Sequence, residues 1–179
     1  IYRPAAQPAR PRHEVQTLFE LGRGLHGESA PTRDLRRLRT LVLDEDIVAG
    51  DAGTVQITRK WLHSGRPPEI VRAWFAALHK RGGWSGICSE GERDLGELLG
   101  EAAGMRVRYF GDVRSWKEAI AASAHVVTPD TGAAHLAGML GIRCTDFFEA
   151  ERYEAQVEQW APWAAVSTVA QFPSMTRRG

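Results

Sequence analysis

The sequence lacks the long apolar run that a membrane helix requires, because no stretch approaches the ~18 residues needed to cross a bilayer. It also lacks a strong charge of one sign: the formal net charge is +1. This excludes the basic excess typical of nucleic-acid-binding proteins. Residues 1–4 show neither an initiator methionine nor the pattern of a signal peptide. We therefore expect a globular segment of a longer or trimmed chain, with no nucleic acid among its partners.

Cysteine is scarce, and the common nucleotide-binding glycine motifs are missing. Cys88 and Cys144 each lie in an apolar, strand-like context without a C-x-x-C spacing, which predicts buried, reduced thiols and a cytoplasmic location. The six histidines show no metal-ligand spacing, so no metal is expected. Neither G-x-G-x-x-G nor a Walker loop occurs, which disfavours the usual dinucleotide and nucleoside-triphosphate sites.

The first third of the chain has little regular pattern. Three prolines within residues 1–12 indicate a linker, and the apolar spacing over 13–25 predicts a helix. A short strand is expected at 41–43, and the basic run 33–39 is interpreted as a solvated face. We predict that residues 1–53 form an interdomain segment that contains a helix.

From residue 54 onward, short apolar strands alternate with amphipathic helices. Strands are expected over 55–57, 84–88, 106–110, 125–127, 142–148 and 164–169, and helices over 70–78, 94–103, 116–122, 133–140 and 150–159. This alternation predicts an α/β fold, a Rossmann-like doubly wound parallel sheet, over residues 54–179. Ligands bind such sheets beyond the carboxyl ends of the strands, which selects the loops after the first four of them.

The segment 128–137 carries the clearest chemistry. A buried strand ends there in a tight turn and a helix begins, which is the geometry of an anion site. Gly132 would let the backbone approach a diphosphate, Thr131 would offer a hydroxyl and an N–H, and Asp130 would cap the helix or contact a sugar hydroxyl. His135 would face the same ligand and, when protonated, neutralise part of its charge. The alternatives are a plain N-cap turn and a structural histidine.

Two further loops carry polar candidates. Thr58, Arg59 and Lys60 follow the first strand, where a hydroxyl and a cation suit a diphosphate, although a solvated loop would read the same way. Glu92 follows the second strand and would accept hydrogen bonds from ribose or sugar hydroxyls. Alternatively, Glu92 is an acid favoured at a helix start.

The segment 130–137, followed by Gly141-Ile142, resembles the nucleotide-sugar-binding signature of the ADP-heptose:lipopolysaccharide heptosyltransferases, glycosyltransferase family 9. Weaker similarity follows in the family's order over roughly residues 13–170. It is carried by His13-Glu14-Val15, Thr58-Arg59-Lys60, Pro68-Glu69, Trp74 and Glu90-Gly91-Glu92-Arg93.

The resemblance implies the two-domain GT-B fold, of which this chain would be the C-terminal, donor-binding half. The acceptor site and catalytic base would lie in an N-terminal domain or companion chain, so no catalytic residue is expected here. The implied activity is an inverting, metal-independent transfer of a heptose-like sugar from a nucleoside-diphosphate donor, without a cofactor. An ADP-sugar is the first expectation for that donor. The acceptor would be a saccharide or lipid-linked molecule of lipopolysaccharide biosynthesis. The protein would then act in the bacterial cytoplasm, peripherally associated with the inner membrane face.

The resemblance also implies that Val113 lies near the nucleobase and that a basic residue near Lys60, or Arg66 in its place, holds the diphosphate. The chain departs from the family at Arg143, where a small residue or proline is usual, and at 147–150, where a Gly-Pro-Thr turn is usual. This second departure supports the alternative function, a non-catalytic nucleotide-binding or assembly module. Another Rossmann-type enzyme is a weaker alternative.

Overall fold

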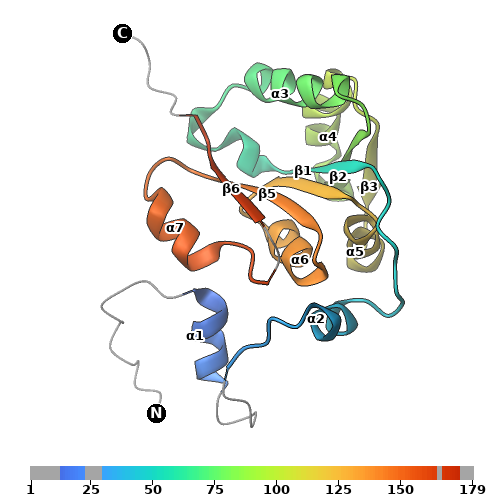
Figure 1. The fold of residues 1–179 in the computed structure, drawn as a ribbon. Coiled ribbons are helices and arrows are strands. Elements are labelled where there is room, and N and C mark those ends of the chain that lie inside the picture. Colours follow the sequence, from blue (N-terminus) through green and yellow to red (C-terminus); the bar gives the residue numbers. More distant parts are fainter. Residues whose placement is uncertain (1–12, 23–29, 165–166, 174–179) are drawn as a thin grey trace.

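Six parallel strands form one sheet whose strand order reverses in the middle (Figure 1). The computed structural model describes residues 13–22, 30–164 and 167–173. The strands are β1 (Gly53–Ile57), β2 (Trp84–Ser89), β3 (Val107–Phe110), β4 (His125–Pro129), β5 (Arg143–Phe148) and β6 (Ser167–Gln171). Their order is β3-β2-β1-β4-β5-β6 and every neighbouring pair is parallel. The predicted Rossmann-like doubly wound fold is confirmed, and the switch in strand order lies between β1 and β4.

Helices cover both faces of the sheet. The α-helices are α1 (Glu14–Leu21), α2 (Leu35–Val42), α3 (Pro68–Lys80), α4 (Arg93–Leu99), α5 (Val113–Ala121), α6 (Gly132–Leu140) and α7 (Tyr153–Trp160); the 3₁₀ helices are η1 (Arg59–Gly65), η2 (Glu90–Glu92) and η3 (Glu101–Ala103). Helices α3 and α4 lie on one face, and α5 and α6 lie on the other, with α2 beyond them (Figure 1). A parallel sheet buried in this way accounts for the near-continuous apolar strands of the sequence.

The core consists of two apolar layers, one on each side of the central strands. Val55 and Ile57 of β1 pack toward Trp61 and Phe75, while Val126 of β4 lies in the layer formed by α5 and α6. Alternate residues of a strand point to opposite faces, so adjacent strands supply both layers. The sheet is therefore rigidly held, and its carboxyl edge can position loop residues accurately.

The predicted strand at 41–43 is wrong, because these residues continue and end helix α2. The carboxylate of Asp34 caps this helix by accepting hydrogen bonds from the N–H groups of Arg36 and Arg37, at 2.9 and 3.4 Å. Buried Leu38 anchors it, and Arg39 donates to the carbonyl of Leu140. The cap and the tertiary contacts override the strand preference of a short aliphatic run.

Two predicted helices begin or end elsewhere. The helix expected over 94–103 divides at Gly100 into α4 and η3. The helix expected from 150 begins at Tyr153, because Arg152 adopts a left-handed conformation with φ 64°. The remaining strands and helices are confirmed to within a few residues of their predicted ends.

Several predictions lie outside the described residues: the linker over 1–12, the end of the first helix near 25, and residues 165–166 of the last strand. The boundary at residue 53 stays a prediction. Both cysteines are free and buried, as expected, and burial raises the pKa of the Cys88 thiol to about 11 and that of Cys144 to about 12. Within the described ranges, no helix has the length and apolarity needed to cross a membrane.

Candidate functional site

The turn between β4 and α6 presents free N–H groups at a helix N-terminus. Thr131 is the N-cap: its hydroxyl accepts from the N–H of Ala133 at 3.3 Å and shares a 2.8 Å hydrogen bond with the hydroxyl of Thr128. Among the described residues, the backbone N–H groups of Thr131 and Gly132 have no hydrogen-bond acceptor. Two unpaired donors at the positive end of a helix dipole form a site for an anion.

Open space lies in front of Gly132. Its backbone conformation is ordinary, and a Cβ added there would meet only the Trp116 ring, at 3.8 Å. Trp116 is held by a 2.8 Å hydrogen bond from its indole N–H to Gln56 on β1. The chain itself therefore does not require glycine at this position. Trp116 borders the turn. In the sequence, its spacing predicted only that it belongs to a helix.

Lys60 and His135 both approach Asp130 at this turn. The ammonium of Lys60 donates to the Asp130 carbonyl and lies 3.6 Å from its Oδ2 atom. His135 Nε2 lies 3.7 Å from Asp130 Oδ1. Because Thr131 caps the helix, the prediction that Asp130 might do so is wrong. Asp130 instead holds two basic side chains beside the unpaired N–H groups.

His135 is half-buried, and its environment favours the neutral imidazole. Burial lowers the pKa of His135, as do the positive charges of His13 and Lys60, while Asp130 opposes them. In the absence of an anion the ring is therefore uncharged at neutral pH. A bound diphosphate would add negative charge beside the ring and raise this pKa again.

A buried carboxylic acid lies next to the turn. Asp146 pairs with Thr128 in the β4–β5 register and is fully buried. Neither carboxyl oxygen has a hydrogen-bond partner among the described residues. Burial raises the pKa of Asp146 to about 8, repulsion from Asp130 adds to the shift, and Lys60 opposes it. Asp146 was not among the predicted site residues, and its one signal in the sequence is an acidic residue inside an apolar strand.

The other predicted residues lie farther from the turn. The hydroxyl of Thr58 caps η1 by accepting from the Lys60 N–H at 3.3 Å, which places Lys60. Glu92 pairs with Arg59 at 3.3 Å and so joins the loops after β1 and β2. Val113 begins α5 after β3 and is 67% exposed. Strand β3 is two strands away from β1.

Arg66 is unsuited to replace Lys60. Its side chain is only 1% exposed, donates to the Trp61 carbonyl at 2.7 Å, and pairs with Glu149 at 3.1 Å. It also stacks on Phe172, 3.6 Å from the ring centroid. The prediction that it could bind the diphosphate is wrong, because the guanidinium is committed within the core. Glu149 belongs to the unusual segment 147–150, and this ion pair gives that residue a structural role.

The hollow at this edge is small. It measures about 110 Å³ and is bordered by Lys60, Asp130, Phe148, Glu149 and Gln156, among others. That is room for a phosphate-sized group, with the rest of a larger ligand lying outside the hollow. Within the described part of the chain, no group of three or more histidine, cysteine or acidic side chains could hold a metal ion.

Comparisons with known proteins identify the fold. No protein-family model and no curated protein sequence matches the chain. Among solved structures, E. coli heptosyltransferase WaaC with ADP is similar at a TM-score of 0.65 and 19% identity, covering 96% of this chain and 54% of that one. The same enzyme with ADP-2-deoxy-2-fluoro heptose gives 0.59 and 19%, covering 96% and 53%. A glycosyl transferase family 9 structure from Veillonella parvula gives 0.57 and 16%, covering 94% and 51%.

The chain thus shares the fold of these heptosyltransferase and glycosyltransferase family 9 structures, as its sequence resemblance predicted. It spans about half the length of the structures it matches. The ADP and the ADP-sugar analogue belong to the two structures of the E. coli enzyme.

Proposed function

We propose that this chain is the donor-binding domain of a glycosyltransferase and binds an ADP-sugar at the crevice between β1 and β4. The observation that carries the proposal is the convergence of Lys60, His135 and two unpaired N–H groups at the switch in strand order. Ligands of doubly wound sheets bind at this switch. The fold shared with a heptosyltransferase that was solved with ADP supports an adenine nucleotide as the ligand.

Each group would have a distinct role toward the diphosphate. The N–H groups of Thr131 and Gly132 would donate to phosphate oxygens, and Lys60 would exchange its contact with Asp130 for the phosphate. His135 would gain a proton as the anion approaches. Together these donors would stabilise the charge that develops on the departing nucleoside diphosphate. Thr58 would keep Lys60 in place, and Glu92 and Val113 would line the path toward the sugar and nucleobase.

The complete reaction requires groups that we assign to a second domain or companion chain. A carboxylate from that domain would deprotonate the acceptor hydroxyl, and the sugar would transfer with inversion, without a metal or cofactor. The sugar would be heptose-like, and the acceptor a saccharide or lipid-linked molecule of lipopolysaccharide biosynthesis. The enzyme would act in the cytoplasm, peripherally at the inner membrane. This chain alone should bind nucleotide without turnover.

Calorimetric titration with ADP, UDP and GDP tests the donor site. Gly132→Ala should weaken ADP binding about tenfold or more, ~1.4 kcal/mol, because its methyl group occupies the space in front of the free N–H groups. The variant should be at least as stable as the wild type. Alanine fits this backbone conformation and would raise the free energy of unfolding by about 0.5 kcal/mol. Failure of all three nucleotides to bind would refute the proposal.

A pair of lysine variants provides the matched control. Lys60→Gln should weaken ADP binding, because it removes the cation beside Asp130. Lys80→Gln removes the same charge from the exposed end of α3 and should leave ADP binding unchanged. Equal effects of the two variants would show that only net charge matters, and would contradict a specific role for Lys60.

The second candidate function is a nucleotide-binding or assembly module without catalysis. The segment 147–150 favours it, because Glu149 is held by Arg66 and by the hydroxyl of Ser64 at 3.1 Å. A turn fixed in this way is less free to close around a sugar. The two functions differ in one measurement: release of ADP from an ADP-sugar by the full-length protein with acceptor present, which only the transferase supports.

A further inference from the structure

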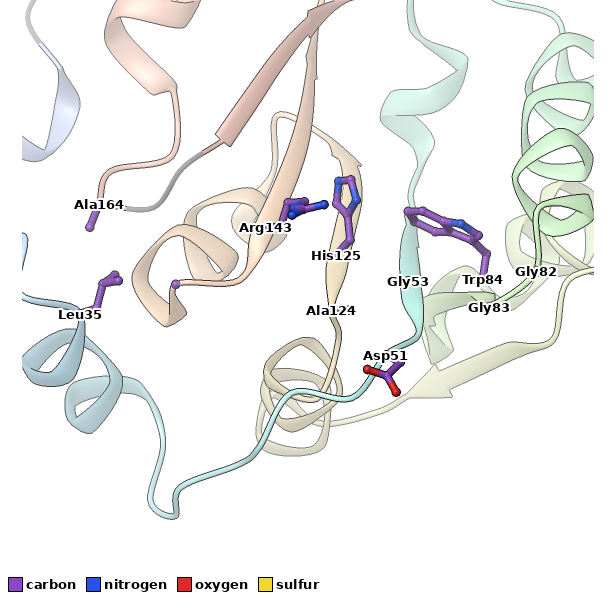
Figure 2. A pocket seen from close by; sticks show the side chains of 11 residues that line it. Leu35, Asp51, Gly53, Gly82, Gly83, Trp84, Ala124, His125, Arg143 and Ala164 are labelled. Carbon is purple, nitrogen blue, oxygen red and sulfur yellow. The ribbon is translucent and has the colours of Figure 1, made fainter.

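A hollow lies at the opposite edge of the sheet from the candidate donor site, where the strands begin (Figure 2). Its volume is about 810 Å³, and it is open to solvent on one side. It is lined by the first residues of four neighbouring strands: Gly53, Trp84, His125 and Arg143. A hollow of this size falls within the range of small-molecule sites, and the proposed donor site does not use it.

Strand register brings these four residues into one row. Gly53 pairs with Trp84 on one side and His125 on the other, and His125 pairs with Arg143. Residues in register on parallel strands share a face of the sheet, and Figure 2 shows the side chains of Trp84, His125 and Arg143 side by side across it. The row spans four strands, so it is built by the fold rather than by one loop.

Gly53 allows the indole of Trp84 to lie against the strand. A Cβ at position 53 would come within 2.6 Å of the indole ring, so no larger residue fits without moving it. The indole is half-exposed, and its ring centroid lies 5.4 Å from that of His125. Trp84 lines the hollow, so the accessible part of its ring offers an apolar surface against which another ring could pack.

The other end of the row is cationic and lacks an acidic partner. Arg143 is exposed, and no ion pair or hydrogen bond of its side chain occurs among the described residues. His125 Nε2 shares a 2.9 Å hydrogen bond with the hydroxyl of Thr145, and no hydrogen bond of its Nδ1 atom occurs within the described ranges. Burial lowers the pKa of His125 and the adjacent Arg143 charge lowers it further. Asp51 is the one acid of the lining, and it forms no ion pair with Arg143.

We propose that this row is a second ligand site, for a small molecule that carries a phosphate or carboxylate next to a ring with an apolar face. The ring would stack on Trp84, and the anion would accept hydrogen bonds from the Arg143 guanidinium and from His125, as an arginine fork does for phosphate and carboxylate. Either an aromatic ring or a pyranose would pack against Trp84 in this way. The proposal is independent of the donor site, which lies at the other ends of β1 and β4.

Nitrogen-15 NMR of this chain tests the site with four probes: phenyl phosphate, glucose 1-phosphate, inorganic phosphate and glucose. We expect at least one ring phosphate to shift the Trp84 indole and His125 imidazole resonances, and to bind ten times or more tightly than inorganic phosphate or glucose. The two ring phosphates distinguish an aromatic from a sugar ligand. Resonances of Gly132 and His135 report the donor site separately.

Variants complete the test. Arg143→Gln should reduce binding of the effective ring phosphate at least tenfold, and Trp84→Phe should reduce it less. Arg106→Gln removes an exposed charge near the same edge, outside the hollow, and should have no effect. The proposal is overturned if no probe moves these resonances at 10 mM, if inorganic phosphate binds as well as the ring phosphates, or if Arg143→Gln binds like the wild type.

Discussion

Asp146 links the stability of the protein to pH. The pKa of this carboxyl is 3.8 in the unfolded chain and about 8 in the folded protein. At a pH between these two values, Asp146 is protonated in the folded protein and ionised in the unfolded chain. Its contribution to stability is therefore complete below pH ~4 and is lost as the pH rises toward 8. Each unit corresponds to about 1.4 kcal/mol, so we expect a loss of about 3 kcal/mol from this residue between pH 5 and 7.5.

The Asp146→Asn variant isolates this contribution. Asparagine has no proton to lose, so the difference in unfolding free energy between variant and wild type should grow in favour of the variant as the pH rises. Urea denaturation at several pH values measures it. His125 and His135, whose pKa values are lowered, contribute in the opposite direction in both proteins. A difference that is independent of pH would contradict a neutral Asp146.

His135 should couple nucleotide binding to proton uptake. Its pKa is lowered in the free protein and should rise when a diphosphate lies beside it, so ADP should bind about threefold to tenfold more tightly at pH 6 than at pH 8. ADP itself takes up a proton in this range, which opposes the effect. Calorimetry on His135→Ala supplies the reference. From pH 8 to pH 6, the affinity for ADP should increase more in the wild type than in this variant. Parallel profiles would contradict the role of His135.

At the scale of the elements, the end of α6 depends on its contact with α2. Gly141 ends α6 in a left-handed conformation, φ 70°, and a Cβ there would lie 3.1 Å from Leu35. Gly82, after α3, has φ 76° and no atom within 4 Å of its added Cβ. Gly82→Ala should therefore cost only backbone strain, ~1 kcal/mol. Gly141→Ala should cost about 1 kcal/mol more, measured by urea denaturation. Equal costs would show that Leu35 yields freely.

The elements differ in how far sequence alone predicts them. Strands such as β1 and β4 are predictable because burial on both faces requires a continuous apolar run. Helix α2 is not, because its aliphatic end has a strand preference that only the Asp34 cap and the burial of Leu38 overrule. The turn at 130–135 is predictable because strand, turn and helix start are contiguous in the chain.

Residues that meet across strands were beyond the reach of the sequence. Trp84, His125 and Arg143 are separated by 41 and 18 positions and become neighbours only through strand register. Sequence patterns mark Asp146 as acidic without showing that it is unpaired. The ion pair of Arg66 and Glu149 joins η1 to the end of β5 over a long separation, which local spacing cannot reveal.

At the scale of the whole molecule, this ion pair joins three segments of the carboxyl edge. Arg66 connects η1, Glu149 after β5, and the Phe172 ring after β6. Glu149→Ala would leave a buried guanidinium without its acid, and we expect a loss of about 2 kcal/mol, reduced from the fully buried case because Glu149 is 27% exposed. The double variant Arg66→Met, Glu149→Ala should lose less than the sum of the single variants. Additive losses in chemical denaturation would contradict the coupling.

Strand β4 separates the two proposed ligand sites. It begins at His125 in the row with Arg143 and ends at Pro129 beside the turn with free N–H groups. At about 3.3 Å per residue, its length of ~16 Å exceeds that of a diphosphate or of a single ring. Hydrogen bonding to β1 and β5 holds it on both sides. If both proposed sites bind their ligands, saturating ADP at one end should leave the dissociation constant of a ring phosphate at the other end unchanged.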